Sequence, residues 1–482
     1  MVKTYSKTYS LGRRLFVLCT AFFIAMGLAA CGGGGGVAVG GGGGNAQATV
    51  AQGTITGFGS IFVNGVEFST NGAQVTINNA AGQASSLRLG QRVTVTGQRS
   101  GTTGTATRID YNPELEGQIT AIDPANSQFT VLGQTVAVTG TTVYRNVTDF
   151  TALAVGNFVE VSGRRDSAGV IVASYVEART AAVELEVHGV VASLDTSART
   201  FRIGPQLVSY ANATLSPSTL ALQNGLRVEV GGALAGGTLN ATRVSADDDR
   251  LPAGQGDASL EGVVRQILSS TQFVVGSTTV QISPSTRIIN GAITDIALNV
   301  EVEVEGSVDA NGVLQATSIR VEHASQIRVT ADIQSINSAN RTVTVLGGIT
   351  VAVSDRTRIQ DKRNNVQPFG FTNLVVGDHV EVAAALINGQ LTATRLERVA
   401  ASSTVELRAP VTSSDPILFT LLLQGVTVNL TNAQFRDANE NPLTLSAFLA
   451  AATPGVVVNI RGTFDSLRLN ATRAELESPD ED

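Results

Sequence analysis

The chain has 482 residues, of which 43% are hydrophobic and 15% charged, and it contains no tryptophan. This balance excludes an intrinsically disordered chain, and the length allows roughly three or more domains. The formal net charge is −7. Four of the 33 basic residues (Lys3, Lys7, Arg13 and Arg14) lie in a segment that we expect to be removed, which leaves 29 against 40 acidic residues, or −11. That charge repels nucleic acids and anionic membranes, so we expect no nucleic-acid partner.

Residues 1–30 have the pattern of a secretory signal peptide. A basic segment that ends at Arg14 precedes the apolar run LFVLCTAFFIAMGLAA, which is too short to span a membrane comfortably. The run ends in Leu28, Ala29, Ala30 and Cys31, which resemble a bacterial lipobox. The resemblance implies cleavage before Cys31 and a lipid on its thiol, and Gly32 at the next position favours the outer membrane. An ordinary signal peptide with an incidental cysteine is the alternative.

A glycine-rich segment, GGGGGVAVGGGGGNAQ, follows the cysteine. Such a composition forms no core and behaves as a flexible coil. A phosphate-binding loop would need a preceding strand and a following helix, and the pattern indicates neither. We therefore predict that residues 31–52 are a tether between the lipid and the folded part.

Two linked patterns recur six times in the same order along the rest of the chain. The first is Gly-x-x-Val-x-Val-x-Gly, in which Asn299 replaces the first glycine of the fourth copy. The second is Ala-Thr or Ala-Ser followed by one residue and usually an aliphatic residue. The first pattern begins at Gly90, Gly156, Gly225, Asn299, Gly377 and Gly455, and the second at Ala106, Ala173, Ala241, Ala316, Ala393 and Ala471.

Apolar and polar residues alternate within the patterns, which predicts β-strands. Asn64-Gly65 predicts a tight hairpin, because both residues tolerate a positive φ. Phe129, Phe201 and Phe273 recur at intervals of 72 residues, and we expect Phe62 and Phe419 to hold similar places. Five or six short strands per repeat would leave open edges unless the sheet closes. We therefore predict an all-β array of about six small barrels, OB-like or SH3-like.

The repeats also give the domain boundaries. The longest break, Ser245 to Ser259, is acidic and would split the array into three plus three repeats. The predicted β repeats are 53–112, 113–180, 181–246, 259–324, 325–400 and 401–476, with an acidic linker at 247–258 and an acidic tail at 477–482.

The segment GFGSIFVNGVEFST, from Gly57 to Thr70, and both repeated patterns resemble bacterial lipoproteins that carry domain of unknown function 5666. The resemblance covers Gly53 to roughly Val399, and the sixth repeat departs most. There Ala409 stands in place of a glycine, and Pro410 cannot donate to a strand ladder, so we expect an edge or irregular strand. The resemblance implies export and a small β-barrel, and it implies no activity and no catalytic residues.

Few residues suggest chemistry. His188, His323 and His379 lie in different repeats without metal-ligand spacing, and we interpret them as isolated strand histidines rather than ligands or bases. Asp247-Asp248-Asp249 lacks the spacing of a calcium loop and is interpreted as an exposed linker. An arginine follows Ala-Thr in four repeats. We interpret it as a solvent-facing residue of the strand rather than as a repeated contact to an anion. These arginines are Arg108, Arg243, Arg395 and Arg473.

We therefore predict a non-enzymatic, lipid-anchored protein of the cell envelope, with no catalytic residues, metal or cofactor. The repeats would form a binding or scaffold array for an unknown envelope protein or polymer, where several weak contacts add up. A purely structural spacer is the alternative, and an enzyme or metal-binding protein is less favoured. The sequence leaves open which membrane face the protein occupies and its oligomeric state.

Overall fold

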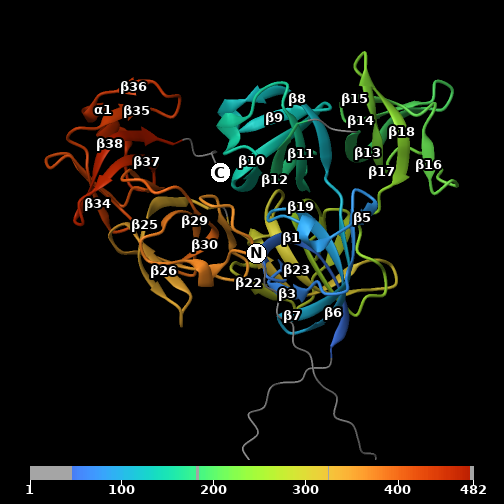
Figure 1. The fold of residues 1–482 in the computed structure, drawn as a ribbon, viewed down its shortest axis with the longest axis horizontal. Coiled ribbons are helices and arrows are strands. Elements are labelled where there is room, and N and C mark those ends of the chain that lie inside the picture. Colours follow the sequence, from blue (N-terminus) through green and yellow to red (C-terminus); the bar gives the residue numbers. More distant parts are fainter. Residues whose placement is uncertain (1–45, 181–183, 324, 478–482) are drawn as a thin grey trace, which may run out of the picture. The chain divides into compact units, whose positions relative to one another are not determined.

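The computed structural model describes residues 46–180, 184–323 and 325–477, all within one unit of the chain. The predicted lipobox and lipidation site, Leu28 to Cys31, lie outside these residues. The described part is almost entirely β, with a single short α-helix, and none of its helices is long and apolar enough to cross a membrane. Figure 1 colours the chain in sequence order, so the six repeats can be followed from blue to red.

Each repeat folds as a small barrel with one order of strands: a long first strand, a short hairpin, further short strands, and a final hairpin. Barrel 1 contains β1 (Gln47–Phe58), β2 (Ile61–Val63), β3 (Val66–Ser69), β4 (Gln74–Ile77), β5 (Ala80–Gly82), η1 (Ala84–Ser86), β6 (Arg92–Ser100) and β7 (Thr103–Tyr111). Barrel 2 contains β8 (Leu115–Asp123), η2 (Pro124–Asn126), β9 (Gln128–Val131), β10 (Gln134–Arg145), η3 (Phe150–Ala152), β11 (Phe158–Arg165) and β12 (Ile171–Arg179). Barrel 3 contains β13 (Leu185–Asp195), β14 (Thr200–Ile203), β15 (Gln206–Ser209), β16 (Thr214–Ser216), β17 (Arg227–Ala235) and β18 (Thr238–Ala246).

The second half of the chain repeats the order. Barrel 4 contains β19 (Asp257–Ser269), β20 (Gln272–Val275), β21 (Thr278–Gln281), β22 (Arg287–Ile289), η4 (Ile293–Asp295), β23 (Glu301–Val308) and β24 (Leu314–Val321). Barrel 5 contains β25 (Ile327–Asn337), β26 (Thr342–Val345), η5 (Leu346–Gly348), β27 (Ile349–Ala352), β28 (Arg358–Asp361), η6 (Phe371–Asn373), β29 (His379–Ile387) and β30 (Gln390–Arg398). Barrel 6 contains β31 (Val405–Pro410), β32 (Ser413–Asp415), β33 (Thr420–Leu423), β34 (Val426–Asn429), β35 (Gln434–Arg436), β36 (Pro442–Leu443), α1 (Leu445–Ala451), β37 (Val457–Phe464) and β38 (Arg468–Leu476).

Hydrogen bonds close each sheet into a barrel. In barrel 1 the circuit runs β1–β2–β3–β7–β6–β1, and the β3–β7 pairing is parallel whereas the others are antiparallel. Barrels 2 to 5 repeat this circuit. In barrel 6 the first strand is divided, so that β31 pairs with β37 and β32 pairs with β33. An SH3-like barrel is antiparallel throughout, so the parallel closure makes these barrels OB-like, which confirms the predicted fold class.

The repeated glycines have two separate structural causes. The first glycine of each pattern ends a turn with a left-handed backbone; φ is 84° at Gly90, and Asn299, which replaces it in barrel 4, has φ 68°. The second glycine sits where the final hairpin bulges. A Cβ on Gly232 would lie 2.2 Å from the carbonyl oxygen of Asn240, so a side chain does not fit there without movement.

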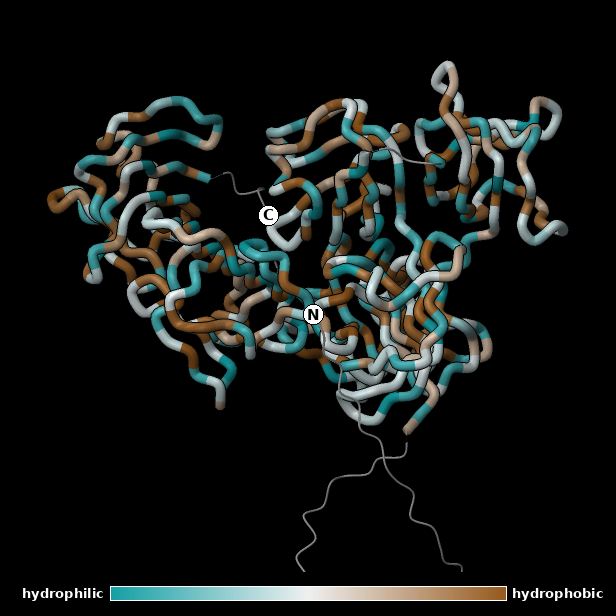
Figure 2. Tube along the Cα trace, viewed as in Figure 1, coloured by the Kyte–Doolittle hydropathy of each residue, from teal (hydrophilic) through white to brown (hydrophobic). Residues whose placement is uncertain are grey.

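Alternation along the strands builds the cores. On β17, Val228 and Val230 are fully buried inside the barrel, and Glu229 between them points out of it. Figure 2 shows the resulting change between hydrophobic and hydrophilic residues along the strands. Phe129, Phe201 and Phe273 are all buried, as their spacing predicted.

Each first strand has an edge that its own barrel leaves unpaired. The first half of the strand pairs with the penultimate strand on one side, and only the second half pairs with the short hairpin on the other; in barrel 1 these halves are residues 47–54 and 55–58. Open edges of this kind invite pairing with another strand.

The six free edges pair with one another in twos. β1 pairs in parallel with β19, β8 pairs antiparallel with β13, and β25 pairs antiparallel with β31. Barrels 1 and 4, 2 and 3, and 5 and 6 therefore share three continuous sheets. The predicted division into three plus three repeats is wrong, because the edge of barrel 1 is covered by barrel 4 across the predicted linker.

The structure also tests the predicted hairpin, the predicted irregular strand and the predicted end of the tether. Asn64 and Gly65 have φ 52° and 72°, as the hairpin requires, and β31 stops at Pro410, which confirms the irregular strand. The tether was predicted to extend to residue 52, but β1 begins at Gln47, because residues 47–54 pair with β6.

The places predicted for two phenylalanines are wrong. Phe62 points out of β2, where Ile61 and Val63 are the buried residues. Phe419 lies in a turn and is 41% exposed, and Leu421 fills the core position. The register of the short hairpin decides which side chain points into the core, and a single phenylalanine in the sequence does not determine that register.

We predict that Gly232→Ala destabilises barrel 3 by about 1–3 kcal/mol, since the new methyl group would overlap a backbone carbonyl. Amide hydrogen exchange should increase over β17 and β18 and stay unchanged in barrel 6. Ala384→Gly is the matched control, because Ala384 holds the same place in barrel 5. Unchanged exchange in Gly232→Ala would show that the close approach does not constrain this position.

Candidate functional site

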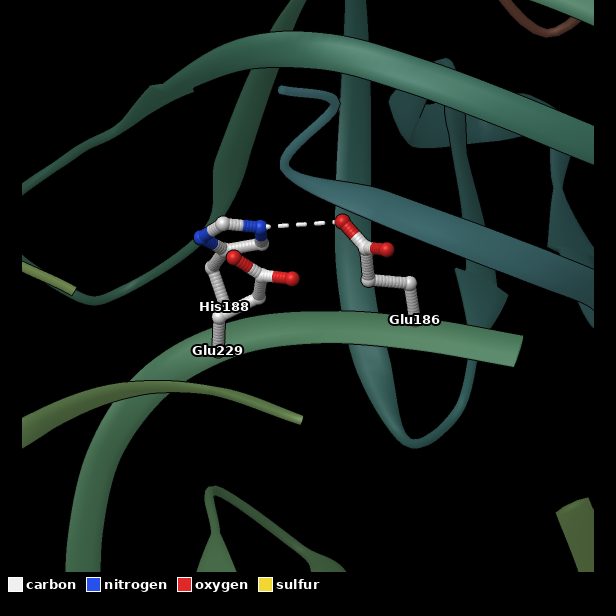
Figure 3. Close-up of side chains that lie close together, drawn as sticks. All are labelled: Glu186, His188 and Glu229. Atoms are coloured by element: carbon white, nitrogen blue, oxygen red, sulfur yellow. Dashed lines mark hydrogen bonds and ion pairs between the residues drawn. The ribbon is translucent and has the colours of Figure 1, made fainter. Parts of the chain in front are cut away.

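A cluster of buried ionisable side chains lies on the outer face of barrel 3. Glu186 and His188 are two residues apart on β13, so both point out of the barrel, and Glu229 on β17 is paired with His188 across the sheet. Ligand atoms of the three residues all lie within 4.8 Å of one another (Figure 3). All three are buried, because barrels 1 and 2 cover this face: Asn79 contacts Glu229, and β8 pairs with β13.

His188 is held between two carboxylates. Its Nδ1 lies 2.9 Å from Oδ2 of Asp247, and its Nε2 lies 3.2 Å from Oε1 of Glu186. Burial alone would lower the pKa of His188, but the hydrogen bonds to Asp247 and Glu186 outweigh it and raise this pKa to about 10. The imidazole is therefore protonated at neutral pH and donates from both nitrogens.

Other cations and donors satisfy the same carboxylates. Arg243 on β18 contacts Glu229 and lies 3.3 Å from Oε2 of Glu186. The amide of Asn79 donates to both carboxylate oxygens of Glu229, at 2.9 and 3.0 Å. Arg227 lies 2.8 Å from Asp247, and His188 and Arg227 together lower the pKa of Asp247 to about 2 against the opposing effect of burial.

The donor set of Glu186, His188 and Glu229 is that of a transition-metal site, but its surroundings do not suit a cation. A metal needs neutral histidine and free carboxylate oxygens. Here the histidine is protonated and the guanidinium of Arg243 already occupies both glutamates. The arrangement is an ion-pair network that ties barrel 3 to barrel 1 and to the segment after β18.

A second group of carboxylates adjoins this network. Glu116 on β8 is paired with Glu186 across the junction of barrels 2 and 3. Burial raises the pKa of Glu116 to about 7, and the charges of Glu160 and Glu186 add to this, whereas Arg179 at 3.8 Å opposes it. Glu116 therefore exchanges its proton near neutral pH.

The structure corrects the interpretation of the histidines and of the acidic run. His188 is not isolated, because Asp247 and Glu186 contact it, and no pattern in the sequence indicates these contacts. His379 contacts Asp332 at 2.6 Å, and His323 lies beyond the end of β24, next to the carbonyl of Asn290. Asp247 is mostly buried, so the exposed-linker interpretation is wrong for this residue, although Asp248 is exposed and pairs with Arg250.

The four arginines after Ala-Thr do not simply face solvent. Each forms an ion pair with a carboxylate of its own barrel, and Arg395 is only 6% exposed. The pairs are Arg108–Asp110, Arg243–Glu229, Arg395–Glu397 and Arg473–Glu475.

We predict that His188 makes the stability of barrel 3 depend on pH. The pKa of His188 is raised in the folded chain, so its contribution is complete below the unfolded pKa of about 6.5 and is lost as the pH rises toward about 10. The melting temperature should therefore fall between pH 7 and 10, and His188→Gln should reduce this fall while lowering stability at pH 7.

The exposed His323 supplies the control, as His323→Gln should leave the pH profile unchanged. Glu322, whose pKa burial raises to about 8, adds a smaller alkaline loss in every variant. A wild-type profile that is flat from pH 7 to 10, or one identical in His188→Gln, would contradict a protonated His188.

Comparison with known proteins agrees with the repeat structure. The family model described as a domain of unknown function (DUF5666) matches residues 49–110, 116–177, 188–245, 261–320 and 331–397. No curated protein matches the chain. The five matches coincide with barrels 1 to 5 and together cover more than half of the chain, so the protein belongs to the DUF5666 family.

Proposed function

We propose that the protein is a non-enzymatic, lipid-anchored component of the cell envelope whose barrels form a binding or scaffold array. The observation that carries the proposal is the pairing of the first strands, which joins the barrels in twos. The ionisable cluster supports the same conclusion, since its members hydrogen-bond to one another. A substrate would have to displace these ion pairs.

One turn favours binding over a purely structural spacer. The turn between β32 and β33 exposes Ile417 by 84%, Leu418 by 66% and Phe419 by 41%. Oδ1 of Asp415 accepts hydrogen bonds from the backbone N–H groups of Ile417 and Leu418, so the apolar side chains remain outside the turn. Three adjacent exposed apolar residues are typical of an interaction surface.

The same turn is polar or small in other barrels. In barrel 3 it carries Ser197, Ala198 and Arg199, and Asp195 accepts the equivalent hydrogen bonds. Arg199 and Phe419 both have a φ of 53°, a value that is uncommon for a bulky residue. The turn of barrel 6 therefore keeps the backbone of its relatives and differs in the surface that it presents.

We predict that transplanting the barrel 3 turn into barrel 6, by Ile417→Ser, Leu418→Ala and Phe419→Arg, removes binding without loss of fold. The backbone accepts these residues in barrel 3, so the melting temperature should change little. Cross-linking in intact cells should then lose the envelope component that the wild type retains. Ala339→Ser with Asn340→Ala, which creates the same turn in barrel 5, is the matched control and should keep it. If the wild type cross-links to nothing, the spacer function replaces the binding function.

We predict that Cys31→Ser abolishes lipid attachment. The variant should incorporate no radiolabelled palmitate and should move from the membrane fraction to the soluble fraction, because the proposed anchor is covalent. Cys19→Ser is the matched control, since Cys19 lies in the predicted signal peptide and should be dispensable. Labelling of Cys31→Ser, or its continued sedimentation with membranes, would contradict the anchor.

A further inference from the structure

Two arginines face each other where barrels 5 and 6 join. Arg328 on β25 is paired with Arg408 on β31 in the short antiparallel ladder between the barrels. Side chains paired in this way start about 4.5–5.5 Å apart, and like charges there are destabilising. Such an arrangement needs negative charge nearby.

The equivalent junction of barrels 2 and 3 shows how the chain meets this need. There the like-charged pair is Glu116 and Glu186. Glu186 is compensated by His188 and Arg243, and Glu116 by Arg179. Both members of that pair therefore have partners of opposite charge within the chain.

At the junction of barrels 5 and 6 the compensation is incomplete. Arg408 lies 3.7 Å from a carboxylate oxygen of Glu477. Arg328 forms no hydrogen bond or ion pair with any described residue, and its buried Nε lacks an acceptor. Burial lowers the pKa of Arg328, and the charges of Arg395 and Arg408 lower it further, against the smaller opposing effect of Glu381 and Glu406.

The two arginines line a cavity of about 710 Å³ between β25, β31 and barrel 2. Three carboxylates also line it, but each has another partner: Glu381 contacts Arg395, Glu477 contacts Arg408, and Asp149 accepts from the backbone of Thr151. Glu381 attracts Arg328 from a distance, but none of the three forms a hydrogen bond or ion pair with it.

We propose that this cavity binds a phosphate group, with Arg328 and Arg408 as its main ligands. Guanidinium groups present paired N–H donors that match the oxygens of a tetrahedral oxyanion, and such charge-assisted hydrogen bonds are strong. The volume also admits the organic part of a phosphate ester. The proposal concerns this cavity alone and does not depend on the scaffold function.

The test is calorimetric titration of the full chain, with Cys31→Ser for solubility, with inorganic phosphate at constant ionic strength. Binding should be detectable, and Arg328→Gln should weaken it at least about tenfold, in line with the loss of hydrogen bonds to a charged group. Arg328→Lys keeps the charge and should bind between the two. Arg287→Gln is the control, since Arg287 is exposed on β22 and forms no ion pair with a described residue; it should bind like the parent.

Stability without ligand gives a second readout. Because Arg328 forms no hydrogen bond or ion pair with a described residue, Arg328→Gln should not lower the melting temperature in phosphate-free buffer, and it should abolish the rise that phosphate causes in the parent. A comparison of glucose 6-phosphate with glucose distinguishes an esterified phosphate from the free ion. The proposal is overturned if phosphate does not bind at 10 mM, or if Arg287→Gln weakens binding as much as Arg328→Gln. It is also overturned if binding appears only after removal of residues 478–482, because the anion at these arginines would then be a carboxylate of the chain itself.

Discussion

The free edge of each first strand is the constraint on which the rest of the structure depends. An OB-like circuit closes the sheet, but the first strand is longer than the short hairpin beside it, so half of one edge remains open. The chain covers these edges by pairing them in twos, so the six first strands form three pairs. Barrel 6 lies outside the matched family repeats, yet its β31 covers the edge of barrel 5.

Joining barrels through their strands places outward-facing side chains at the junctions, where they become buried. Burying a charge is unfavourable unless it is paired and hydrogen-bonded. The network of His188, Glu186 and Arg243 satisfies this condition at the junction of barrels 2 and 3. At the junction of barrels 1 and 4, Arg99 forms two hydrogen bonds with Asp257, at 2.6 and 2.7 Å, and a third with Glu305. Such buried pairs add little net stability, because the cost of desolvating the charges offsets much of their attraction.

The barrel itself could be predicted from the sequence because its causes are local. The left-handed turn at Gly90 and the crowded bulge at Gly232 each favour glycine, so the requirement is visible in every copy apart from Asn299 in barrel 4 and Ala384 in barrel 5. Alternating valines indicate the strands in the same way. The predicted division into three plus three repeats was wrong because the partner of β1 lies about 200 residues away, and no local pattern records it.

The candidate site could not be predicted from the sequence for the same reason. Glu186 and His188 are neighbours on one strand, but Glu229, Asp247 and Asn79 reach them only through the sheet and the packing of barrel 1. The pattern does contain one usable signal: a glutamate stands between the two valines in barrels 2 to 5, at an outward position. These are Glu160, Glu229, Glu303 and Glu381, and each contacts an arginine. In the folded chain Glu160, Glu229 and Glu303 are buried at this outward position.

The pairing of barrel 1 with barrel 4 can be tested by a disulfide across β1 and β19. Val50 and Ala258 are paired and buried, and the chain has only two native cysteines, which can be replaced by serine. In such a chain, Val50→Cys with Ala258→Cys should form an intramolecular disulfide, seen as a mobility change on a denaturing gel without reductant. Val50→Cys with Ala409→Cys, two positions that no strand pairing joins, should not. Equal cross-linking of both pairs, or of neither, would contradict the edge-pairing account.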